Sequence, residues 1–532
     1  MNKKIWLKNY EKGIKHTFEV PTITLPDLLE RAAKEHKDSL AIRYEGNSMT
    51  YGELYHTASN IAGNLRLHGL DRGDKVCVFL PNLPETVLSF WGVQQAGLVG
   101  VMTNPLYSPD EILHQIKNSE SKAVITTNAL LPKVLQIIEQ TDVESVFCVT
   151  VEADRPVDYT QEGIYPWERL LTENIGYKCK KTKPSDLALL QYTGGTTGVS
   201  KGCMLSQSNL ISNAMMFREF FCSVLTEGKE KFVAVLPYFH IYGLQVNIVL
   251  TALVASATYP VMRFTPISLL ELIQEEKLTV LASAPSIFNA CLSRPELKNY
   301  DLSSLKIVLS GSAPLAVAQK QLFEDMTGAK VCEGYGLSET SPVTHFTPVV
   351  GENKPGSIGM PMPSTNAKIV DLEYGVKELP QGEEGELCIQ GPQVMSGYYK
   401  SPAETADVLD EEGWLKTGDI ARMDEDGYFY ITGRKKELII TGGYNVYPRE
   451  IEEVLFKHEA IKEVVAKGIP DELRGEAVKA YVVLNEGATL TKNEVVAYCR
   501  KHLANYKVPR EVEFMKELPK SAVGKILRRA LN

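Results

Sequence analysis

One stretch of this sequence places glycines, aliphatic hydroxyls and a lysine directly after an apolar run. Leu187–Leu190 are all apolar, and Thr193–Gly202 read TGGTTGVSKG, with Lys201 near the end. Glycines let a backbone turn tightly and bring N–H groups against an anion, hydroxyls add donors, and a lysine adds a point charge. The pattern predicts a strand followed by a loop that binds a polyphosphate.

Two better-known glycine-rich motifs differ from this stretch. A nucleoside-triphosphate P-loop requires Ser or Thr directly after its lysine, whereas Gly202 follows Lys201 here. The nucleophile elbow of hydrolases, G-x-S-x-G, matches Gly198–Gly202 with Ser200 as its nucleophile. That elbow places its serine directly on a strand-to-helix turn, and here glycines and threonines intervene. A hydrolase and an ordinary flexible loop are therefore the weaker interpretations.

Length, charge and cysteine usage bound the class of protein. A chain of 532 residues is too long for one core and should form at least two domains. The net charge of -9 and the absence of a compensating basic cluster argue against a nucleic-acid binder. The 9 scattered cysteines include no CxxC pair, which indicates free thiols in a reducing compartment and neither a zinc site nor a disulfide framework.

The sequence favours a cytoplasmic protein. Its N-terminus, MNKKIWLKNYEKG, lacks the apolar region of a secretion signal. Phe232–Met262 carries no formally charged residue, but Pro237, His240 and other polar residues interrupt it. We therefore expect a buried strand, a loop and a core helix there rather than a membrane span. Peripheral contact with the inner membrane face and a homodimer are both compatible with the sequence.

Apolar runs alternate with amphipathic segments over roughly the first two thirds of the chain. Helices are expected at 24–36, 51–67, 84–96 and 244–255, and strands at 41–44, 48–51, 75–80, 123–125, 146–151, 187–190, 232–236, 280–282 and 305–309. Such alternation is typical of βαβ units with a largely parallel sheet. Two consecutive βαβ systems before residue 350 predict two sheet subdomains.

The character of the sequence changes after residue 356. Short β runs at 367–370, 385–389 and 428–431 lie among frequent glycines and prolines and predict an antiparallel subdomain. Beyond the charged stretch 432–436, helices are expected at 448–458 and 492–503, and strands at 463–467 and 478–484. The predicted fold is α/β, with a large N-terminal domain (1–433) of two βαβ sheet subdomains plus an antiparallel β subdomain, and a small mobile α+β C-terminal domain (434–532).

Further polar loops carry candidate functional residues. Ser310–Leu315 and Glu333–Thr340 each follow a short apolar strand. Ligands of open α/β sheets bind beyond the carboxyl ends of strands, so these loops could converge with the polyphosphate loop. Glu339 suits Mg²⁺, and Asp419, in Thr417-Gly418-Asp419, could accept the hydroxyls of a ribose. Taken singly, each is more often an ordinary solvated loop residue, as is Lys525 on its turn near the C-terminus.

Taken together and in order, these pieces resemble the core motifs of the adenylate-forming superfamily of acyl-CoA synthetases, luciferase-like enzymes and adenylation domains. The motifs are YTGGTTGVSKG, PYFHIYG, GSAPL, EGYGLSET, GWLKTGD, GRKKELIITGGYNVYPREIE and PKSAVGKILRR, and the resemblance runs from about Leu28 to Arg529. Within the superfamily the chain is most similar to the bacterial long-chain fatty-acid–CoA ligases, through NPLYSP, LQYTGGTTGVSKGCML, GPQVMSGYY and YKVPREVEFMKELPKSAVGKILRR.

The resemblance implies two half-reactions with the substrates ATP, bound with Mg²⁺, a medium- to long-chain fatty acid and coenzyme A. The acid first forms acyl-AMP with release of pyrophosphate, and the CoA thiol then displaces AMP. The implied catalytic residues are Lys525, Glu339, Lys201 and His240, and the implied metal ligands are Glu339 and Thr193. The implied nucleotide- and CoA-binding residues are Thr193, Gly194, Gly195, Thr196, Thr197, Gly198, Gly311, Ser312, Ala313, Pro314, Tyr335, Gly336, Ser338, Asp419, Arg434, Lys436, Gly442, Gly443 and Tyr444.

Individual roles follow from the same resemblance. Lys525 would bridge the substrate carboxylate and the α-phosphate after closure of the small domain, and Lys436 would be its hinge. Closure in a second orientation would bring Gly442–Tyr444 to line the approach of the thiol.

The sequence defines the identity of the carboxylic acid substrate less closely than the reaction. Pro237–Gly243 contains no carboxylate to pair with an α-amino group, which argues against an amino acid. His240 would orient the carboxylate or gate the acyl pocket, or be a core histidine. The same residues also fit a CoA ligase for a hydroxycinnamate-type aryl acid, and an acyl-AMP ligase that loads a carrier protein is a further alternative. Lys525, Glu339 and Asp419 together argue against a non-catalytic nucleotide- or acyl-binding module, because such a module has no need of a transferring lysine.

Overall fold

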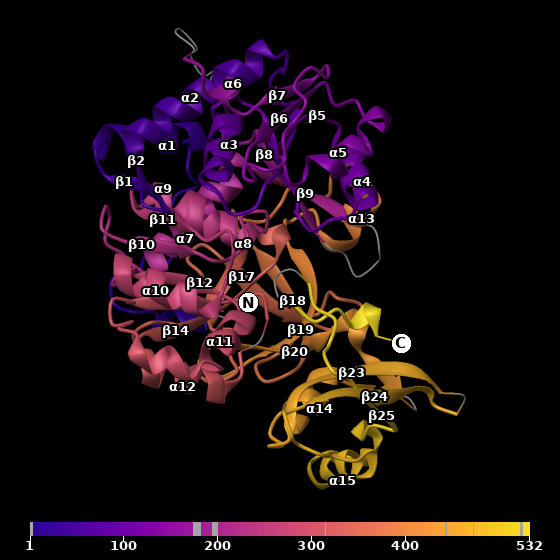
Figure 1. The fold of residues 1–532 in the computed structure, drawn as a ribbon. Helices are drawn as coiled ribbons and strands as arrows, with labels where there is room; N and C mark the ends of the chain where they lie inside the picture. The colour runs from indigo at the N-terminus through magenta and orange to yellow at the C-terminus, as the bar shows by residue number, and fades with distance from the viewer. Residues whose placement is uncertain are drawn as a thin grey trace. The chain divides into compact units, whose positions relative to one another are not determined.

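The computed structural model describes residues 4–173, 182–193, 200–313, 315–441, 444–471, 473–521 and 525–531. The chain forms two compact units, which are coloured along the sequence in Figure 1. The larger unit comprises Asn9–Asn366 and Gln390–Leu415, and the smaller unit comprises Met1–Lys8, Ala367–Ile389 and Lys416–Asn532. The predicted division of the chain at residue 433 stays a prediction.

The first sheet of the larger unit has seven strands in the order β7-β6-β5-β3-β4-β8-β9. Neighbouring strands are parallel, except for the antiparallel pair β8–β9 at the edge. The strands are β3 (Lys75–Phe79), β4 (Val99–Met102), β5 (Ser121–Thr127), β6 (Ser145–Val149), β7 (Ile164–Pro166), β8 (Leu187–Thr193) and β9 (Lys201–Ser206). The predicted N-terminal βαβ system is therefore confirmed, with α3 (Pro84–Gln95) and α4 (Pro109–Ser119) as two of its crossovers.

The second sheet has nine strands in the order β16-β15-β14-β13-β12-β10-β11-β1-β2. Its strands are β1 (Leu40–Tyr44), β2 (Asn47–Thr50), β10 (Lys231–Ala234), β11 (Ala257–Pro260), β12 (Val280–Ser283), β13 (Ile307–Ser310), β14 (Lys330–Gly336), β15 (Val343–Phe346) and β16 (Met360–Pro361). The central strands are parallel, and β2, β15 and β16 add antiparallel edges. The N-terminal hairpin β1–β2 joins this sheet by pairing with β11.

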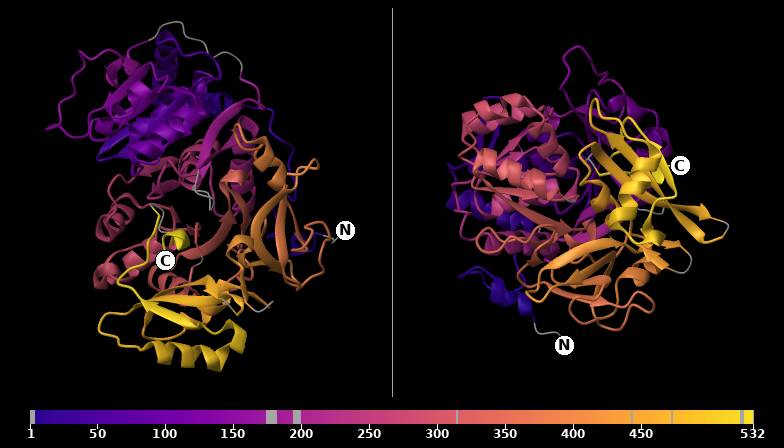
Figure 2. Two further views of the ribbon diagram at one scale, coloured as in Figure 1. Left: turned by 90° about the vertical axis from the view of Figure 1, so that its right-hand side faces the viewer. Right: turned by 90° about the horizontal axis from the view of Figure 1, so that it is seen from below.

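The remaining helices of the larger unit lie around these sheets (Figures 1 and 2). They are α1 (Leu25–Glu35), α2 (Tyr51–Leu67), α5 (Leu131–Leu135), α6 (Glu168–Leu171), α7 (Gln207–Phe220), α8 (Ile241–Leu244), α9 (Leu250–Leu253), α10 (Pro266–Glu276), α11 (Pro285–Leu292), α12 (Val317–Thr327) and α13 (Pro402–Val408). A π-helical stretch, Gln245–Val249, joins α8 to α9, so the predicted helix 244–255 is confirmed but begins earlier. None of the helices in the described residues is apolar and long enough to span a membrane.

Local signals explain where the first helices begin. The side chain of Thr24 accepts a hydrogen bond from the Asp27 N–H, Asp27 bonds back to the Thr24 backbone, and a proline occupies the first turn of α1. Thr50 forms the same capping box with Glu53 at the start of α2. The predicted strand 48–51 was therefore displaced by one residue from β2 (Asn47–Thr50), because Tyr51 already belongs to the helix.

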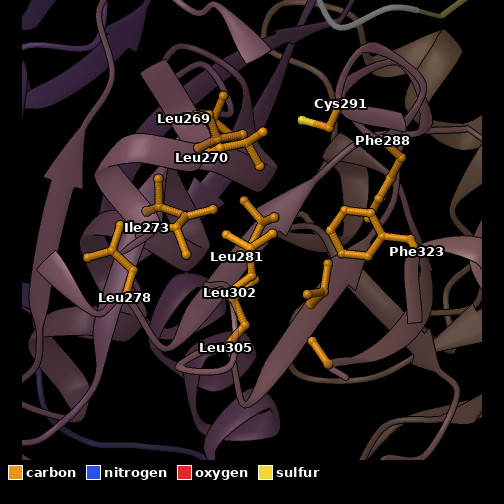
Figure 3. Close-up of a cluster of buried hydrophobic side chains, with 14 of the residues drawn as sticks. Leu269, Leu270, Ile273, Leu278, Leu281, Phe288, Cys291, Leu302, Leu305 and Phe323 are labelled. Atoms are coloured by element: carbon orange, nitrogen blue, oxygen red, sulfur yellow. The ribbon is translucent and has the colours of Figure 1, made fainter. Parts of the chain in front are cut away.

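An apolar cluster packs α10, α11 and α12 against strands of the nine-stranded sheet. Figure 3 shows its leucines, Ile273 and the pair Phe288 and Phe323, whose ring centroids lie 4.9 Å apart. Full burial of each such side chain contributes about 1.5–3 kcal/mol. The cluster fixes the sheet from which the loop after β13 and the end of β14 extend.

The smaller unit contains two further sheets. A four-stranded sheet has the order β17-β18-β19-β20, and a five-stranded sheet has the order β22-β21-β24-β23 with β25 paired to β24. Their strands are β17 (Asn366–Val370), β18 (Gly385–Gln390), β19 (Leu415–Met423), β20 (Phe429–Arg434), β21 (Ile439–Thr441), β22 (Tyr444–Val446), β23 (Ile461–Asp471), β24 (Gly475–Leu484) and β25 (Glu511–Phe514). The helices are α14 (Pro448–Leu455) and α15 (Lys492–His502). The predicted small α+β fold is confirmed, and β19, which carries Asp419, is a strand that the sequence did not predict.

Alternating residues of β23 face two different layers. Val464 packs with α14 and α15, whereas the next residue, Val465, packs with Leu518 and Leu531 of the C-terminal segment. Successive side chains of a strand point to opposite faces, so the helices cover one face and the C-terminal segment covers the other. Figures 1 and 2 show α15, in yellow, on the helical face. Lys525 belongs to the segment on the opposite face.

One predicted loop is instead a strand. Glu333–Gly336 continue β14, with Glu333 paired to β13 and Gly334–Gly336 paired to β15, whereas we expected a polar loop after Cys332. A Cβ atom at Gly334 would overlap the ring of Phe346, and one at Gly336 would overlap the backbone of Pro342. The glycines therefore serve close packing between β14 and β15 and do not form a turn there.

Candidate active site

The predicted polyphosphate loop joins the two strands of the β8–β9 hairpin. Thr193 and Lys201 are partners in its register, so the two ends of the loop lie opposite each other. Because the connection runs from strand to strand, it is not the strand-to-helix turn of a nucleophile elbow, and Ser200 does not occupy a hydrolase geometry. Near the end of the loop, His114 Nε2 lies 3.0 Å from the carbonyl oxygen of Ser200. The predicted phosphate ligands Gly194, Gly195, Thr196, Thr197 and Gly198 lie outside the described residues.

Lys201 contacts both a carboxylate and an aromatic ring. Its Nζ is 2.8 Å from Glu404 Oε1 on α13 and 5.3 Å from the centre of the Tyr398 ring. The hydrogen bond from Lys201 lowers the pKa of the Glu404 carboxyl. The lysine ammonium is thus held between a carboxylate and an aromatic face at the edge of β9.

Glu339 lies in the 3-10 turn Ser338–Thr340, which packs against β8 and β9. Its Oε1 accepts a hydrogen bond of 2.7 Å from the Tyr398 hydroxyl, and its backbone oxygen accepts one of 2.8 Å from the N–H of Met395. The structure therefore places the predicted metal ligand Glu339 and the predicted phosphate ligands Thr193, Ser338 and Lys201 in neighbouring elements. Tyr398 was not among the predicted residues; a tyrosine in a polar segment after the apolar run 385–389 is the signal that points to it.

A carboxylate held in this way suits Mg²⁺. One Glu339 oxygen is bound by a neutral hydroxyl donor, which leaves acceptor capacity for a cation, and magnesium commonly takes one or two carboxylates with phosphate oxygens. Thr193, the other predicted metal ligand, is the last residue of β8 in the hairpin against which this turn packs. The donor set fits a nucleotide-bound magnesium ion.

The predicted adenine-binding residues surround the ends of β13 and β14. Gly311 follows β13, and a Cβ atom there would lie 3.0 Å from the ring of Tyr242. Ser312 adopts a left-handed φ of 71°, Ala313 follows it, and Pro314 lies outside the described residues. Tyr335 is half-buried at the end of β14, opposite His345 at 6.0 Å between ring centroids. Burial lowers the pKa of His345 to about 3, so this ring is neutral beneath Tyr335.

His240 caps the first turn of α8. Its Nδ1 accepts a hydrogen bond of 3.3 Å from the Tyr242 N–H, and the side chain is half-buried. Gln191 of β8 donates to the carbonyl oxygen of Phe239 at 3.0 Å, which ties this segment to the hairpin strand.

Asn82, which the sequence analysis did not single out, also holds the backbone of the segment before His240. Buried Asn82 donates to the backbone oxygens of Ala234 and Leu236, each at 2.9 Å, and accepts from the Tyr238 N–H at 2.8 Å. A single asparagine after a β-rich run carries no sequence signal that distinguishes it from a turn residue.

The smaller unit brings together a second group of charged residues. Asp419 and Arg434 are partners in the β19–β20 register, and their side chains form an ion pair with 2.8 Å between Oδ1 and Nε. Asp419 is 2% exposed, and Arg434 lies beside its buried charge. Partial desolvation by surrounding atoms and the positive charge of Arg434 lower the pKa of Lys525, while the charge of Asp419 opposes that shift. Asp419, Arg434 and Lys525, predicted from three separate motifs, are therefore electrostatic neighbours.

Arg528 anchors the segment that carries Lys525. Its guanidinium lies 2.7 Å and 3.0 Å from the two carboxylate oxygens of Glu452, and 3.1 Å from Glu437. Such bidentate pairs restrict geometry strongly. The sequence assigned no role to Arg528, because a basic pair near a terminus is usually a solvated surface feature.

The predicted hinge and thiol-side residues lie in the same unit. Lys436 belongs to the 3-10 turn Lys435–Glu437 directly after β20. Tyr444 begins β22, is exposed, and stacks on Tyr506 with 4.7 Å between ring centroids. Gly442 and Gly443 lie outside the described residues.

Two protein-family models match this chain. The family model described as AMP-binding enzyme matches residues 29–399, and that of the AMP-binding enzyme C-terminal domain matches residues 450–525. The chain therefore belongs to the AMP-binding enzyme family of adenylate-forming enzymes.

Individual relatives narrow the class of enzyme to which this chain is similar. The long-chain-fatty-acid–CoA ligase of Bacillus subtilis is 43% identical over 100% of this chain and 98% of its own length. The 4-coumarate–CoA ligase 1 of Solanum tuberosum is 35% identical over 91% of this chain and 88% of its own length. Among solved structures, ATP-bound MatB from Rhodopseudomonas palustris is 30% identical with a TM-score of 0.87, covering 96% of this chain and 98% of that chain.

Proposed function

We propose that this chain is an AMP-forming acid–thiol ligase that converts a long-chain fatty acid to its CoA thioester. The observation that carries the proposal is that the chain contains two groups of charged side chains and is also similar over its full length to a long-chain-fatty-acid–CoA ligase. The first group contains Lys201 and Glu339 beside the β8–β9 hairpin, and the second contains Asp419, Arg434 and Lys525.

In the first half-reaction, a carboxylate oxygen of the acid forms a bond to the α-phosphorus of ATP. The bond from that phosphorus to its bridging oxygen breaks, and pyrophosphate leaves. This transfer depends on positioning and on neutralising negative charge more than on covalent catalysis by the protein. Lys201 and the loop hydroxyls bind the leaving phosphates, and Lys525 stabilises the negative charge shared by the carboxylate and the α-phosphate.

Residues of both units are assigned to the nucleoside. Asp419 has a buried carboxylate, an acceptor-only group that suits the two hydroxyls of a ribose, with Arg434 as its cationic partner. Tyr335 and the loop after β13 frame the adenine. Magnesium, held by Glu339 with Thr193, would neutralise charge on the ATP phosphates.

In the second half-reaction, the CoA sulfur bonds to the acyl carbon, the bond from that carbon to the AMP oxygen breaks, and the thiol proton passes to solvent. We assign Lys436 as the hinge for the change between the two half-reactions, and Gly442, Gly443 and Tyr444 to the approach of the thiol. The homodimer and a peripheral membrane contact stay predictions.

The acid-binding segment suits a carboxylate without a second charge. Tyr238 is fully buried with its hydroxyl 3.0 Å from Thr258, and Phe239 and His240 are half-buried. Pro237–Gly243 contains no acidic residue to receive an amino group. His240 is placed by its cap on α8, where it orients the substrate carboxylate. We favour a fatty acid over an aryl acid because identity to the fatty-acid ligase is higher and extends over the whole chain.

The test is pyrophosphate release by the purified chain with magnesium and ATP across a panel of fatty acids, hydroxycinnamates and amino acids, with and without CoA. We expect release with medium- to long-chain fatty acids, and AMP and acyl-CoA as products only when CoA is present. Release with hydroxycinnamates alone would replace the proposed substrate class. Absence of acyl-AMP with every acid would refute the proposal.

A further inference from the structure

We propose that Tyr398 is the positioning residue that fixes Glu339 and Lys201 relative to each other for the phosphoryl transfer. Its hydroxyl holds the carboxylate proposed for magnesium, and its ring face holds the ammonium proposed for the leaving phosphates. The inference rests on the proposed function, which gives Tyr398 no role.

The backbone of Tyr398 is attached to the hairpin that carries Lys201. Cys203 of β9 and Tyr398 form an antiparallel bridge, and hydrogen bonds on both sides of it extend this pairing. The Met204 N–H donates to Gly397 O at 2.9 Å, and the Tyr399 N–H donates to Gly202 O at 2.8 Å. The segment is in effect a further strand on the edge of β9, so its side chains move with Lys201.

Two more contacts restrict the segment. The N–H of Tyr398 donates to Thr405 Oγ1 at 2.9 Å. The preceding Gly397 has a φ of 136°, and a Cβ atom there would lie 2.7 Å from Thr405 Cγ2. This position therefore requires glycine. With glycine there, the backbone can adopt the conformation in which the next side chain, Tyr398, contacts Glu339.

The hydroxyl of Tyr398 acts on Glu339 as an oriented donor. Its 2.7 Å bond to Oε1 and the 2.8 Å bond from the Met395 N–H to the Glu339 carbonyl oxygen hold the side chain and the backbone of that residue from one segment. A phenol is protonated at neutral pH, so the Tyr398 hydroxyl donates this bond and the carboxylate accepts it. Hydrogen-bond partners of a metal ligand commonly fix its orientation in this way.

The ring of Tyr398 serves Lys201 separately. The ammonium lies 5.3 Å from the ring centre, within the range of a cation–π contact, and Glu404 binds the same ammonium at 2.8 Å. A phenylalanine at this position keeps the ring and removes only the hydroxyl. A leucine removes both, so the two roles can be separated by mutation.

The matched control is the neighbouring tyrosine. The Tyr399 hydroxyl also donates to a glutamate, Glu120 Oε2, at 2.9 Å, but that pair is exposed and lies outside the proposed site. Tyr399→Phe removes the same chemical group one residue away.

The experiment compares wild type, Tyr398→Phe, Tyr398→Leu and Tyr399→Phe by two readouts, after thermal unfolding confirms that each variant is folded. The first readout is Mn²⁺ binding to the protein–ATP complex in the absence of fatty acid, measured by water-proton relaxation. The second is the Mg²⁺ concentration that gives half-maximal pyrophosphate release. For Tyr398→Phe we expect about 10-fold weaker Mn²⁺ binding and a similar rise in the Mg²⁺ requirement. Metal-free ATP binding should weaken only in Tyr398→Leu.

A double-mutant cycle with Glu339→Gln tests whether Tyr398 acts through Glu339. If it does, Tyr398→Phe should have little further effect on Mn²⁺ binding once the carboxylate is gone. Equal shifts in Tyr398→Phe and Tyr399→Phe, or no shift in Tyr398→Phe, would overturn the inference and leave the proposed function intact. The proposed function fails separately, if wild type releases no pyrophosphate with any acid.

Discussion

The two charged groups of this protein are built differently. In the larger unit, Lys201 is bound to Glu404 and Glu339 is bound to Tyr398, so each charged side chain has a fixed partner. In the smaller unit, Asp419 is buried and paired with Arg434, whereas Lys525 is exposed and its positive charge is disfavoured by its surroundings.

The difference corresponds to two tasks. A site that binds a polyphosphate and its metal gains from side chains already held in place, because little reorganisation is then required. A cation that must stabilise charge only while the transfer occurs gains from a position in which no protein carboxylate neutralises it fully. The following predictions test this contrast, from the largest expected effect to the smallest.

Removing Lys525 should affect one half-reaction only. Lys525→Ala should slow pyrophosphate release about 100-fold or more, since losing one group that stabilises charge in a transition state costs on that scale. Thioester formation from supplied acyl-AMP should be largely spared. Lys520→Ala is the matched control, because Lys520 lies on the same segment in a surface pair with Glu463 at 2.6 Å. Equal losses in both half-reactions would contradict the assigned role.

Asp419→Asn should weaken nucleotide binding by about 10- to 100-fold, because a charged acceptor for two hydroxyls is lost. It should also lower the free energy of unfolding by about 1–3 kcal/mol, less than for a fully buried pair because Arg434 is 34% exposed. Isothermal titration with AMP and thermal unfolding measure the two effects. Asp426→Asn, which removes an exposed pair with Lys8 at 3.1 Å, should change neither measurably.

The lowered pKa of Lys525 has a defined sign in a pH profile. A lysine with a lowered pKa loses its proton at a lower pH than the usual 10.5, so adenylation should fall as pH rises through that lowered value. Lys525→Arg keeps its charge at every such pH. We expect lower activity in this variant and loss of the alkaline limb, measured as kcat/KM for pyrophosphate release between about pH 7 and 10.5. An unchanged limb would assign the titration to another group.

Glu404→Gln should have the smallest effect. Phosphates must compete with Glu404 for Lys201, but solvent screens a pair whose carboxylate is 45% exposed, so the competition is weak. We expect the KM for ATP to fall less than about fivefold, and the difference from wild type to shrink at high salt. Asp407→Asn on the same helix is the control. A rise in KM would show instead that Glu404 positions Lys201 for the nucleotide.

Much of the fold was predictable because local signals agree with it. Thr24 and Thr50 cap helices whose apolar spacing already indicated them, and the observed helix Tyr51–Leu67 has the predicted bounds. The strand β19 was missed because its residues, LKTGDIARM, alternate poorly and contain a glycine. Glu333–Gly336 were misassigned because glycines that serve close packing resemble glycines that form a turn.

The candidate site divides in the same way. Motif order predicted Lys201, Glu339, Asp419, Arg434 and Lys525, because a polyphosphate, a metal and a ribose each require particular side-chain chemistry. It did not identify Asn82, Tyr398 or Arg528, whose roles depend on partners far away in the chain.

The sequence by itself determined the chemistry: which charges, hydroxyls and glycines are available, in which order, and around which strands. Only the tertiary structure decided which of them meet. Lys201 and Tyr398 are neighbours because Cys203 and Tyr398 form a bridge between backbones nearly 200 residues apart in sequence. Backbone hydrogen bonds are the same for every residue type, so their partners are selected by the packing of the whole unit and leave no local pattern to read.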